Sequence, residues 1–288
     1  MANRYWISGI SSTWNNTANW SNSSGGSGGY SVPNINDLVI FDSNGNGNCI
    51  LDTTVSIFGL TVLNYTGAIF QNNKEIQIDS SGAFFNSGNF TGSGADIRIS
   101  GNLYLQGSCQ FISTDSTLSC DGTFNYNPTI GFFNSNNGVV SLDATGCVLD
   151  TTGISLSTLQ FNADKALVNQ YVYVEDSVIL KSGSARSISS SAKIHIRGDL
   201  TCESDYNWWN SFNDLQLWFD GSTYQNLEYN AGGVIPNLYI DKTAETPKYN
   251  REPYQVKCYG NSPVVIKNVF LIQDGTFNTN SLDIQVGI

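Results

Sequence analysis

Two short phrases in this chain are each written twice at nearly the same spacing. Residues 49–54 (CILDTT) return at 147–152 (CVLDTT), 98 positions later, and residues 99–103 (ISGNL) return at 196–200 (IRGDL), 97 positions later. Self-similarity at a near-fixed spacing is typical of chains that stack similar units instead of closing into one globule. We therefore expect a repetitive fold whose main feature is an extended surface and not an enclosed pocket.

The composition favours β-structure throughout the chain. Only 13% of the residues are Asp, Glu, Lys or Arg, about half the usual share, and Asn, Ser, Thr and 28 Gly supply most of the polarity. Short β-branched and aromatic runs alternate with polar residues at the period of strands with one buried face, as in 38–41, 75–78, 96–99, 172–174, 193–196, 238–240 and 282–286. No helical period of similar strength is present, so the chain is predicted to be all-β.

A series of β-sandwiches and a parallel β-solenoid both suit this pattern. Glycine recurs at the same place beside strand phrases, in 100–103, 121–124, 220–222 and 274–277. Asn, Ser and Thr are dense enough to form ladders between coils, and tight hairpin dipeptides are few. These features favour a parallel β-solenoid (β-helix) with about 22 residues per coil.

Residues 1–36 differ from the rest of the chain. They hold a Gly/Ser tract at 23–29 and three of the six tryptophans, Trp6, Trp14 and Trp20. Indole rings must be buried, either on the first coil or on a partner. We predict a small N-terminal capping or docking segment at 1–36, with these tryptophans as protein-docking residues, and a β-solenoid at 37–288. Because the last residues still read as a coil, we expect a partner or further chain to cover that end.

Charge and cysteine content limit the partners. A net charge of −11 predicts repulsion from nucleic acid and from anionic membrane surfaces, and no stretch is long and apolar enough to cross a membrane. The six cysteines form no CxxC pair, which excludes zinc-ribbon and thioredoxin sites. Reduced, buried thiols are the simplest interpretation, and a disulfide ladder is the alternative. No secretory signal is visible, so we expect folding in a cytoplasm.

One loop carries part of a calcium-binding pattern. Residues 42–48 fit D-x-N-x-N-G, in which oxygen ligands alternate and a glycine makes the sharp turn. Thr53 stands where the bidentate acid is expected, so the candidate ligands are Asp42, Asn44, Asn46 and Asp52. A polar turn between strands is the alternative interpretation, and no other cofactor is expected.

Residues 203–220 are the densest aromatic and acidic stretch. Sugar rings stack on exposed Trp, and glycoside hydrolysis needs paired carboxylates. The candidate residues for a glycan or subunit contact are Trp208, Trp209, Trp218, Asp205 and Asp214. Packing against a neighbouring coil or subunit is favoured over passive glycan contact, and glycan contact is favoured over catalysis.

Other catalytic patterns are missing from the sequence. His195 is the one histidine; it alternates with Ile194 and Ile196 and should face out of its coil. No G-x-S-x-G motif supports a triad around it, and Walker and dinucleotide-binding patterns are absent. The chain is therefore expected not to be an enzyme.

The opening of the chain combines Trp6, Trp14, 19–21 (NWS) and 37–42 (DLVIFD), and coil-like phrases follow at 221–227 and 236–241. Together they resemble the β-solenoid proteins of bacteriophage virions and, in style, bacterial β-helix adhesins. The resemblance implies a structural component of a phage particle, such as a tail fibre, tail protein or capsid-decoration protein. It also implies assembly in the host cytoplasm, other virion proteins as partners, and a homo-oligomer, with a trimer favoured.

Two alternatives to this interpretation stay open. One is a tailspike-like module that binds or cleaves a host surface glycan. The other is a fragment of a bacterial surface adhesin. Adhesins of this type normally carry a secretory signal, so its absence favours the virion protein.

Overall fold

The computed structural model describes residues 1–187, 192–206, 215–230, 234–242 and 255–287. Strands make up 59% of the chain and form a parallel β-solenoid of about 10 turns, which confirms the predicted fold class. Within the described ranges the one helical element is a short 3₁₀ turn, η1 (Thr17–Asn19), and no helix could span a membrane. The chain divides into two compact units, Met1–Val140 and Ser141–Ile288.

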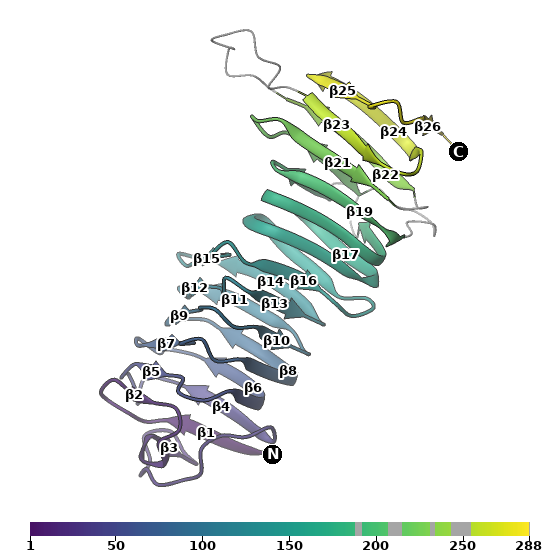
Figure 1. The fold of residues 1–288 in the computed structure, drawn as a ribbon. Coiled ribbons are helices and arrows are strands. Elements are labelled where there is room, and N and C mark those ends of the chain that lie inside the picture. The colour runs from purple at the N-terminus through teal and green to yellow at the C-terminus, as the bar shows by residue number, and fades with distance from the viewer. Residues whose placement is uncertain (188–191, 207–214, 231–233, 243–254, 288) are drawn as a thin grey trace. The chain divides into compact units, whose positions relative to one another are not determined.

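In the first unit each coil contributes strands to a small sheet and to two rows of a larger sheet (Figure 1). The small sheet contains β2 (Ser12–Thr13), β5 (Cys49–Ile50), β7 (Ala68–Phe70), β9 (Asn89–Thr91), β12 (Gln110–Ile112) and β15 (Phe132–Asn134). The larger sheet contains β1 (Ala2–Trp6), β3 (Trp20–Ser21), β4 (Asp37–Phe41), β6 (Val55–Val62), β8 (Ile76–Phe85), β10 (Ile97–Ile99), β11 (Leu103–Gly107), β13 (Thr117–Cys120), β14 (Thr123–Pro128) and β16 (Val139–Leu142). Long strands such as β8 span both rows, because its first part pairs with β10 and its last part with β11.

The core of the first unit consists of inward columns of apolar side chains. Register partners are 21 residues apart over much of this unit, as for Ile76, Ile97 and Leu118. Another inward column, Val39, Leu60, Ala83, Leu103 and Phe124, is buried from end to end. Alternation within each strand turns the intervening polar residues outward, which is how the two-residue period of the sequence produces this core.

The corners between the two rows require residues without a side chain. A Cβ on Gly101, between β10 and β11, would lie 2.6 Å from both Ser80 O and Gly82 N of the preceding coil. Backbone of one coil thus passes directly over backbone of the next. This close approach explains the glycine that recurs beside strand phrases in the sequence.

The N-terminal segment is already part of the solenoid. β1 pairs in parallel with β4, and β2 pairs in parallel with β5, so the parallel sheets begin before residue 37. β3 then pairs antiparallel with β1, bringing Trp20 opposite Trp6, and this short strand covers the free edge of the first coil. Residues 1–36 therefore supply strands of the first coil, with β3 at its edge, and the division of the chain at residue 36 stays a prediction.

The three N-terminal tryptophans are buried in the chain's own core. Trp6 and Trp20 are 0% exposed and Trp14 is 3% exposed. The Trp20 ring centroid lies 4.7 Å from that of Trp14 and 5.3 Å from that of Trp6, and Phe41 continues the cluster. The predicted protein-docking role of Trp6, Trp14 and Trp20 is corrected by this burial, because none of the rings is accessible to a partner.

The coils of the second unit vary in length. Val172 pairs with Ile194, 22 residues on, whereas Gln225 pairs with Val256, 31 residues on. Its strands are β17 (Val148–Ser187), β18 (Lys193–Ile196), β19 (Asp199–Tyr206), β20 (Gln216–Phe219), β21 (Gln225–Tyr229), β22 (Ile235–Asp241), β23 (Gln255–Gly260), β24 (Val264–Asp274), β25 (Thr276–Asn278) and β26 (Ile284–Val286).

All six cysteines are buried, and none of them forms a disulfide. Burial raises the pKa of the Cys109 thiol to about 11 and that of Cys258 to about 12, and raises the pKa of Cys49 and Cys202 well above the ordinary value. These thiols therefore fill the core as small apolar groups, as the sequence indicated.

Candidate functional site

One outward side of the second unit carries a ring at the same position of successive strands. The register places Tyr173 of β17 beside His195 of β18, His195 beside Trp218 of β20, and Trp218 beside Tyr239 of β22. The residues before and after each ring are apolar and buried, so strand alternation fixes the rings on the outer surface. We call these four residues the aromatic column. The outward orientation predicted for His195 is confirmed.

Successive rings of the aromatic column are in contact, stacked from His195 to Tyr239 and tilted by 35° between Tyr173 and His195. Trp218 and Tyr239 are parallel within 2°, with centroids 4.4 Å apart. His195 lies 4.8 Å from Tyr173 and 6.2 Å from Trp218 between ring centroids. Such pairs contribute about 0.5–1.5 kcal/mol each beyond the area they bury. Because ring faces turn toward the next coil, the column stabilises the stacking of coils and presents mainly ring edges to solvent.

Two charged pairs flank the aromatic column. Arg197 Nη1 lies 2.8 Å from Glu175 Oε1, and its guanidinium carbon lies 4.4 Å from the ring centroid of Tyr173. His195 Nδ1 lies 2.5 Å from Asp220 Oδ2, with both side chains largely shielded from solvent. Exposed ion pairs add only about 0–1 kcal/mol to stability. Their main effect here is to fix the orientation of the side chains and to give each carboxylate a hydrogen-bonding partner.

A buried amide organises the corner between β20 and β21. Gln225 Nε2 donates to the carbonyl oxygens of Ile196 and Gly198, at 2.7 and 2.5 Å. Gln225 Oε1 accepts from the backbone N–H of Gly221 at 3.2 Å and from the ammonium of Lys242. The side chain thus joins backbone groups of successive coils, and Ile196 O accepts in addition from the N–H of Asp220 at 3.2 Å.

Lys242 places a positive charge beneath this side of the coil. The side chain is 1% exposed and donates to Thr223 O at 2.6 Å. Burial lowers the pKa of Lys242 to about 8, although the negative charges of Asp220 and Asp199 favour the ammonium. Since the amine is covered by protein, it acts on the outer surface only through the field that it exerts on Asp220.

The His195–Asp220 pair is two thirds of a charge-relay triad. The other ring nitrogen of His195 receives no hydrogen bond from a hydroxyl or thiol anywhere in the described part of the chain. The surroundings of His195 are rings and the Lys193 and Arg197 cations. This arrangement is suited to binding and to structural stacking, and no described nucleophile completes it.

The structure places the predicted aromatic and acidic site only in part. Trp218 lies on the outer side, in the aromatic column, and donates from Nε1 to Gln216 Oε1 at 2.9 Å. Trp208, Trp209 and Asp214 lie outside the described residues, and for Asp205 only the backbone, in β19, is described. The grouping of these five residues thus stays a prediction.

Sequence reasoning missed the ring partners of Trp218. Tyr173 and Tyr239 belong to coils that precede and follow it, at spacings set by loops of unequal length. The available signal was the alternation of Tyr171 and Tyr173 with valines in β17, repeated as Lys193 and His195 with isoleucines in β18. Aligning those strand phrases would have brought the rings together.

The candidate calcium ligands are hydrogen-bonded within the chain, with Asp42 and Asn44 linked to each other and to Ser24. Asp42 Oδ2 accepts from Ser24 Oγ at 2.6 Å, whereas Asp52 Oδ1 accepts from the backbone N–H of Asn15 at 2.9 Å. Asn44 donates to Ser24 Oγ and Asn46 donates to Ser43 O. These contacts fit the polar-turn alternative. The described residues contain no cluster of three or more acidic, His or Cys side chains, and the calcium site stays a prediction.

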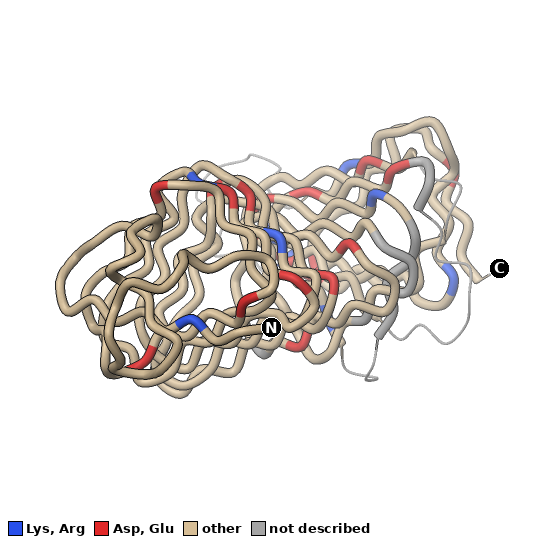
Figure 2. Tube along the Cα trace, turned by 90° about the horizontal axis from the view of Figure 1, so that it is seen from below, with Lys and Arg blue, Asp and Glu red and all other residues tan. Residues whose placement is uncertain are grey.

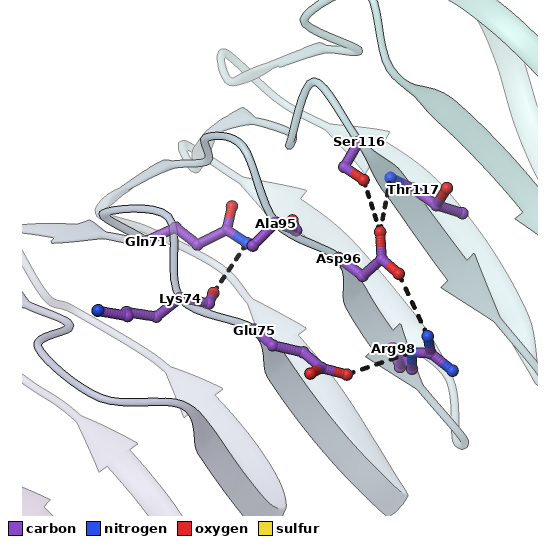
Figure 3. A network of polar contacts seen from close by, with 8 residues as sticks. All are labelled: Gln71, Lys74, Glu75, Ala95, Asp96, Arg98, Ser116 and Thr117. Carbon is purple, nitrogen blue, oxygen red and sulfur yellow. Dashed lines mark hydrogen bonds and ion pairs between the residues drawn. The ribbon is translucent and has the colours of Figure 1, made fainter.

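A polar network on the first unit links corners of successive coils (Figure 3). Arg98 lies 3.2 Å from Asp96 Oδ2 and 3.4 Å from Glu75 Oε1. Asp96 Oδ1 accepts from Ser116 Oγ at 2.6 Å and from the N–H of Thr117 at 3.3 Å. The Ser116 hydrogen bond is the main cause of a lowered pKa for Asp96. The network holds neighbouring coils in register and leaves no free cation at its centre.

Charged residues are sparse along the chain trace, with Asp and Glu outnumbering Lys and Arg by 24 to 13 (Figure 2). Because cations are few in this chain, the presence of both Lys193 and Arg197 against rings of the aromatic column distinguishes this side. Comparison of the chain with protein-family models, curated proteins and solved structures found no match, so the candidate site rests on its own geometry.

Proposed function

We propose that this chain is a non-enzymatic structural β-solenoid with an adhesin-like role, and that it serves as a fibre, tail or capsid-decoration component of a phage particle. The observation that carries the proposal is the outward side of the second unit. There, the aromatic column and the Arg197–Glu175 and His195–Asp220 pairs form a continuous outer surface along successive coils. The resemblance of the opening residues to virion β-solenoid proteins supports the phage assignment.

The state of the acidic groups supports a role without catalysis. Glycoside hydrolysis needs one carboxyl as acid and another as base or nucleophile across the substrate. On the side of the aromatic column, Glu175 is paired with Arg197 and Asp220 with His195. A carboxylate that is already engaged by a neighbouring side chain is not free to approach the bond that would be cleaved.

Attachment to the particle is assigned to the exposed surface of the N-terminal segment. Ile10 is 76% exposed, Ile35 is 42% exposed and Tyr30 is 38% exposed, whereas the three indoles are inside. Exposed apolar side chains close to a rigid cap are what a docking surface needs. This assignment replaces the tryptophans with residues that a partner can reach.

The test is association of the chain with purified particles. The double variant I10S/I35S should lose association while keeping the wild-type circular dichroism spectrum. Ile130 is 82% exposed and lies outside residues 1–36, so I130S is the matched control and should associate normally. Absence of the wild-type chain from particles would refute the virion assignment, and normal association of I10S/I35S would refute the docking surface.

The proposal includes a homo-oligomer, with three chains as the expected state. Light scattering of the purified chain measures this directly. A monomer at all concentrations would remove the trimer from the proposal without affecting the particle experiment.

Contact with a host surface glycan is the second candidate function. The observation that favours it is an open depression of about 400 Å³ beside the aromatic column. Retention of the chain on host cells, and its loss after enzymatic removal of surface polysaccharide, would support this function.

A further inference from the structure

The depression beside the aromatic column lies on the outer surface of β17 and β18. Its volume is about 400 Å³, within the range of small-ligand sites, and its lining is Gln170, Tyr171, Tyr173, Lys193 and His195. β17 and β18 form its floor, where the parallel register places Tyr171 beside Lys193 and Tyr173 beside His195. The backbone ladder between the two strands fixes the positions from which Tyr171, Tyr173, Lys193 and His195 project into the depression.

Tyr171 differs from the rings of the aromatic column in its orientation. Its ring is inclined by 77° to that of Tyr173 and by 84° to that of His195. One side of the Tyr171 ring lies against Gly153, where an added Cβ would be 3.2 Å from the ring. Tyr171 is 37% exposed. Its ring is therefore not covered by parallel stacking and is available to the C–H face of a sugar.

Lys193 supplies the charge of the depression. Its Nζ lies 4.6 Å from the ring centroid of Trp218, and no carboxylate in the described part of the chain forms an ion pair with it. The nearby acids have other partners, since Glu175 pairs with Arg197 and Asp220 with His195. An aromatic face satisfies an ammonium only weakly, so its N–H groups remain able to bind an anion.

We propose that this depression binds an acidic sugar unit, a hexose or nonose that carries a carboxylate, within a surface polysaccharide. Tyr171 stacks on the apolar face of the sugar and Lys193 binds its carboxylate. A neutral sugar would leave the ammonium without a partner, and an isolated anion would leave the ring unused. The inference rests on the adhesin-like function proposed above and names its ligand class.

The overall charge of the chain shapes how this binding behaves. A net charge of −11 opposes an acidic polymer at long range. At physiological ionic strength this repulsion is screened beyond about 8 Å, whereas the contact with Lys193 is direct. Affinity should therefore depend on Lys193 itself and not on the charge of the whole surface.

The test measures binding of the full chain to polygalacturonate and to polysialic acid, with dextran as the neutral polymer, by affinity electrophoresis. We expect binding to at least one acidic polymer and none to dextran. K193M and Y171A should each weaken binding about tenfold or more, as expected for loss of a charge-assisted hydrogen bond or a stacking platform. K193R should retain most of the affinity.

Lys257 provides the matched control. Its Nζ lies 5.0 Å from the ring centroid of Tyr259, in a similar cation–ring contact that is not part of the depression. K257M should bind like the wild type. Equal weakening by K193M and K257M would overturn the site, because only general charge would then matter.

The remaining outcomes separate this inference from the proposed function. Failure to bind either acidic polymer, or binding of dextran that K193M leaves unchanged, overturns the acidic-sugar site. If the chain is still found on particles, the structural function stands without it. Unfolding midpoints equal to the wild type show that a loss of binding by K193M or Y171A is local.

Discussion

Replacing Trp20 with alanine should open the first coil of the N-terminal unit and leave the later coils folded. The ring is 0% exposed, and its centroid lies 4.7 Å from Trp14, 5.3 Å from Trp6 and 6.1 Å from Phe41. Its Nε1 donates to Trp14 O at 2.7 Å. The substitution removes the ring that joins this cluster and leaves a buried carbonyl without its donor.

The expected loss follows from these contacts. A buried indole removes about 150–250 Å² from water, which corresponds to about 4–6 kcal/mol at about 25 cal/mol per Å². Core replacements of this kind cost about 3–5 kcal/mol, and the unpaired carbonyl adds about 1 kcal/mol. We therefore expect a loss of about 4–6 kcal/mol. In a solenoid each coil contacts mainly its neighbours, so the loss should concentrate in the coil that holds the ring.

Hydrogen exchange read by mass spectrometry measures this effect along the chain. Amides of β1 and β4 should exchange about a thousandfold faster in W20A, whereas those of β10 to β14 should change little. W218A is the control, since Trp218 is only part-buried and its substitution should leave β1 unaffected. Unchanged protection of β1 in W20A would refute the structural role of the indole.

Three further predictions concern the coil corners, a buried charge and the thiols. In G198A the new Cβ would lie 1.8 Å from Asp176 O, so urea unfolding should show a loss of stability of several kcal/mol. The control is G9A, whose Cβ would have no atom within 4 Å and whose stability should lie within about 0.5 kcal/mol of the wild type. Equal losses in the two variants would contradict the requirement for glycine at the corner. Burial lowers the pKa of Lys242 to about 8 against an unfolded value of about 10.4, so the unfolded state binds the extra proton between those values. The stability of the wild type relative to K242M should therefore rise from pH 8 to pH 10, and a flat difference would exclude the depressed pKa. None of the six buried thiols should react with Ellman's reagent in the native state, and all six should react in guanidinium. A native disulfide would lower the number of thiols that react in guanidinium.

The fold could be predicted because its signal is local. Alternation within short strands and a glycine at each corner are both visible in the sequence and both required by the structure. The phrase 99–103 spans the corner between β10 and β11, and its repeat at 196–200 spans the corner between β18 and β19. The glycine at the centre of each copy contacts backbone of the preceding coil. In this case the repeated sequence marks an equivalent position in the coil.

The other repeated phrase marks no such equivalence. Cys49 lies in β5 of the small sheet, whereas Cys147 directly precedes β17 of the larger sheet. Parallel register partners range from 20 residues apart, for Ala83 and Leu103, to 37 apart, for Ser12 and Cys49. Because coil length varies, a fixed spacing in the sequence does not correspond to a fixed place in the coil. Loop insertions are tolerated at low energetic cost, so sequence alone does not specify them.

The docking assignment of the tryptophans was wrong for a related reason. Aromatic residues beside a Gly/Ser tract are equally suited to closing a core and to binding a partner. Which of the two occurs depends on whether β3 folds back on β1, and that antiparallel pairing of Trp6 with Trp20 involves no local sequence signal. The exposed Ile10 and Ile35 carry no signal either, since single surface apolar residues are common.

Ring orientation separates structural from binding aromatics on the outer side of the second unit. Composition alone does not distinguish an exposed ring that stacks on a neighbouring ring from one that can stack on a sugar. For this reason the aromatic residues within 203–220 were candidates for glycan contact. Trp218 and Tyr239 are parallel within 2°, and a face occupied by another ring cannot also stack on a ligand. Tyr171, inclined by 77° to its neighbour Tyr173, keeps a face free although it lies outside that stretch. The residue that is best placed for recognition is thus the one that departs from the stack, and departure of this kind can be read only from the geometry of neighbouring coils.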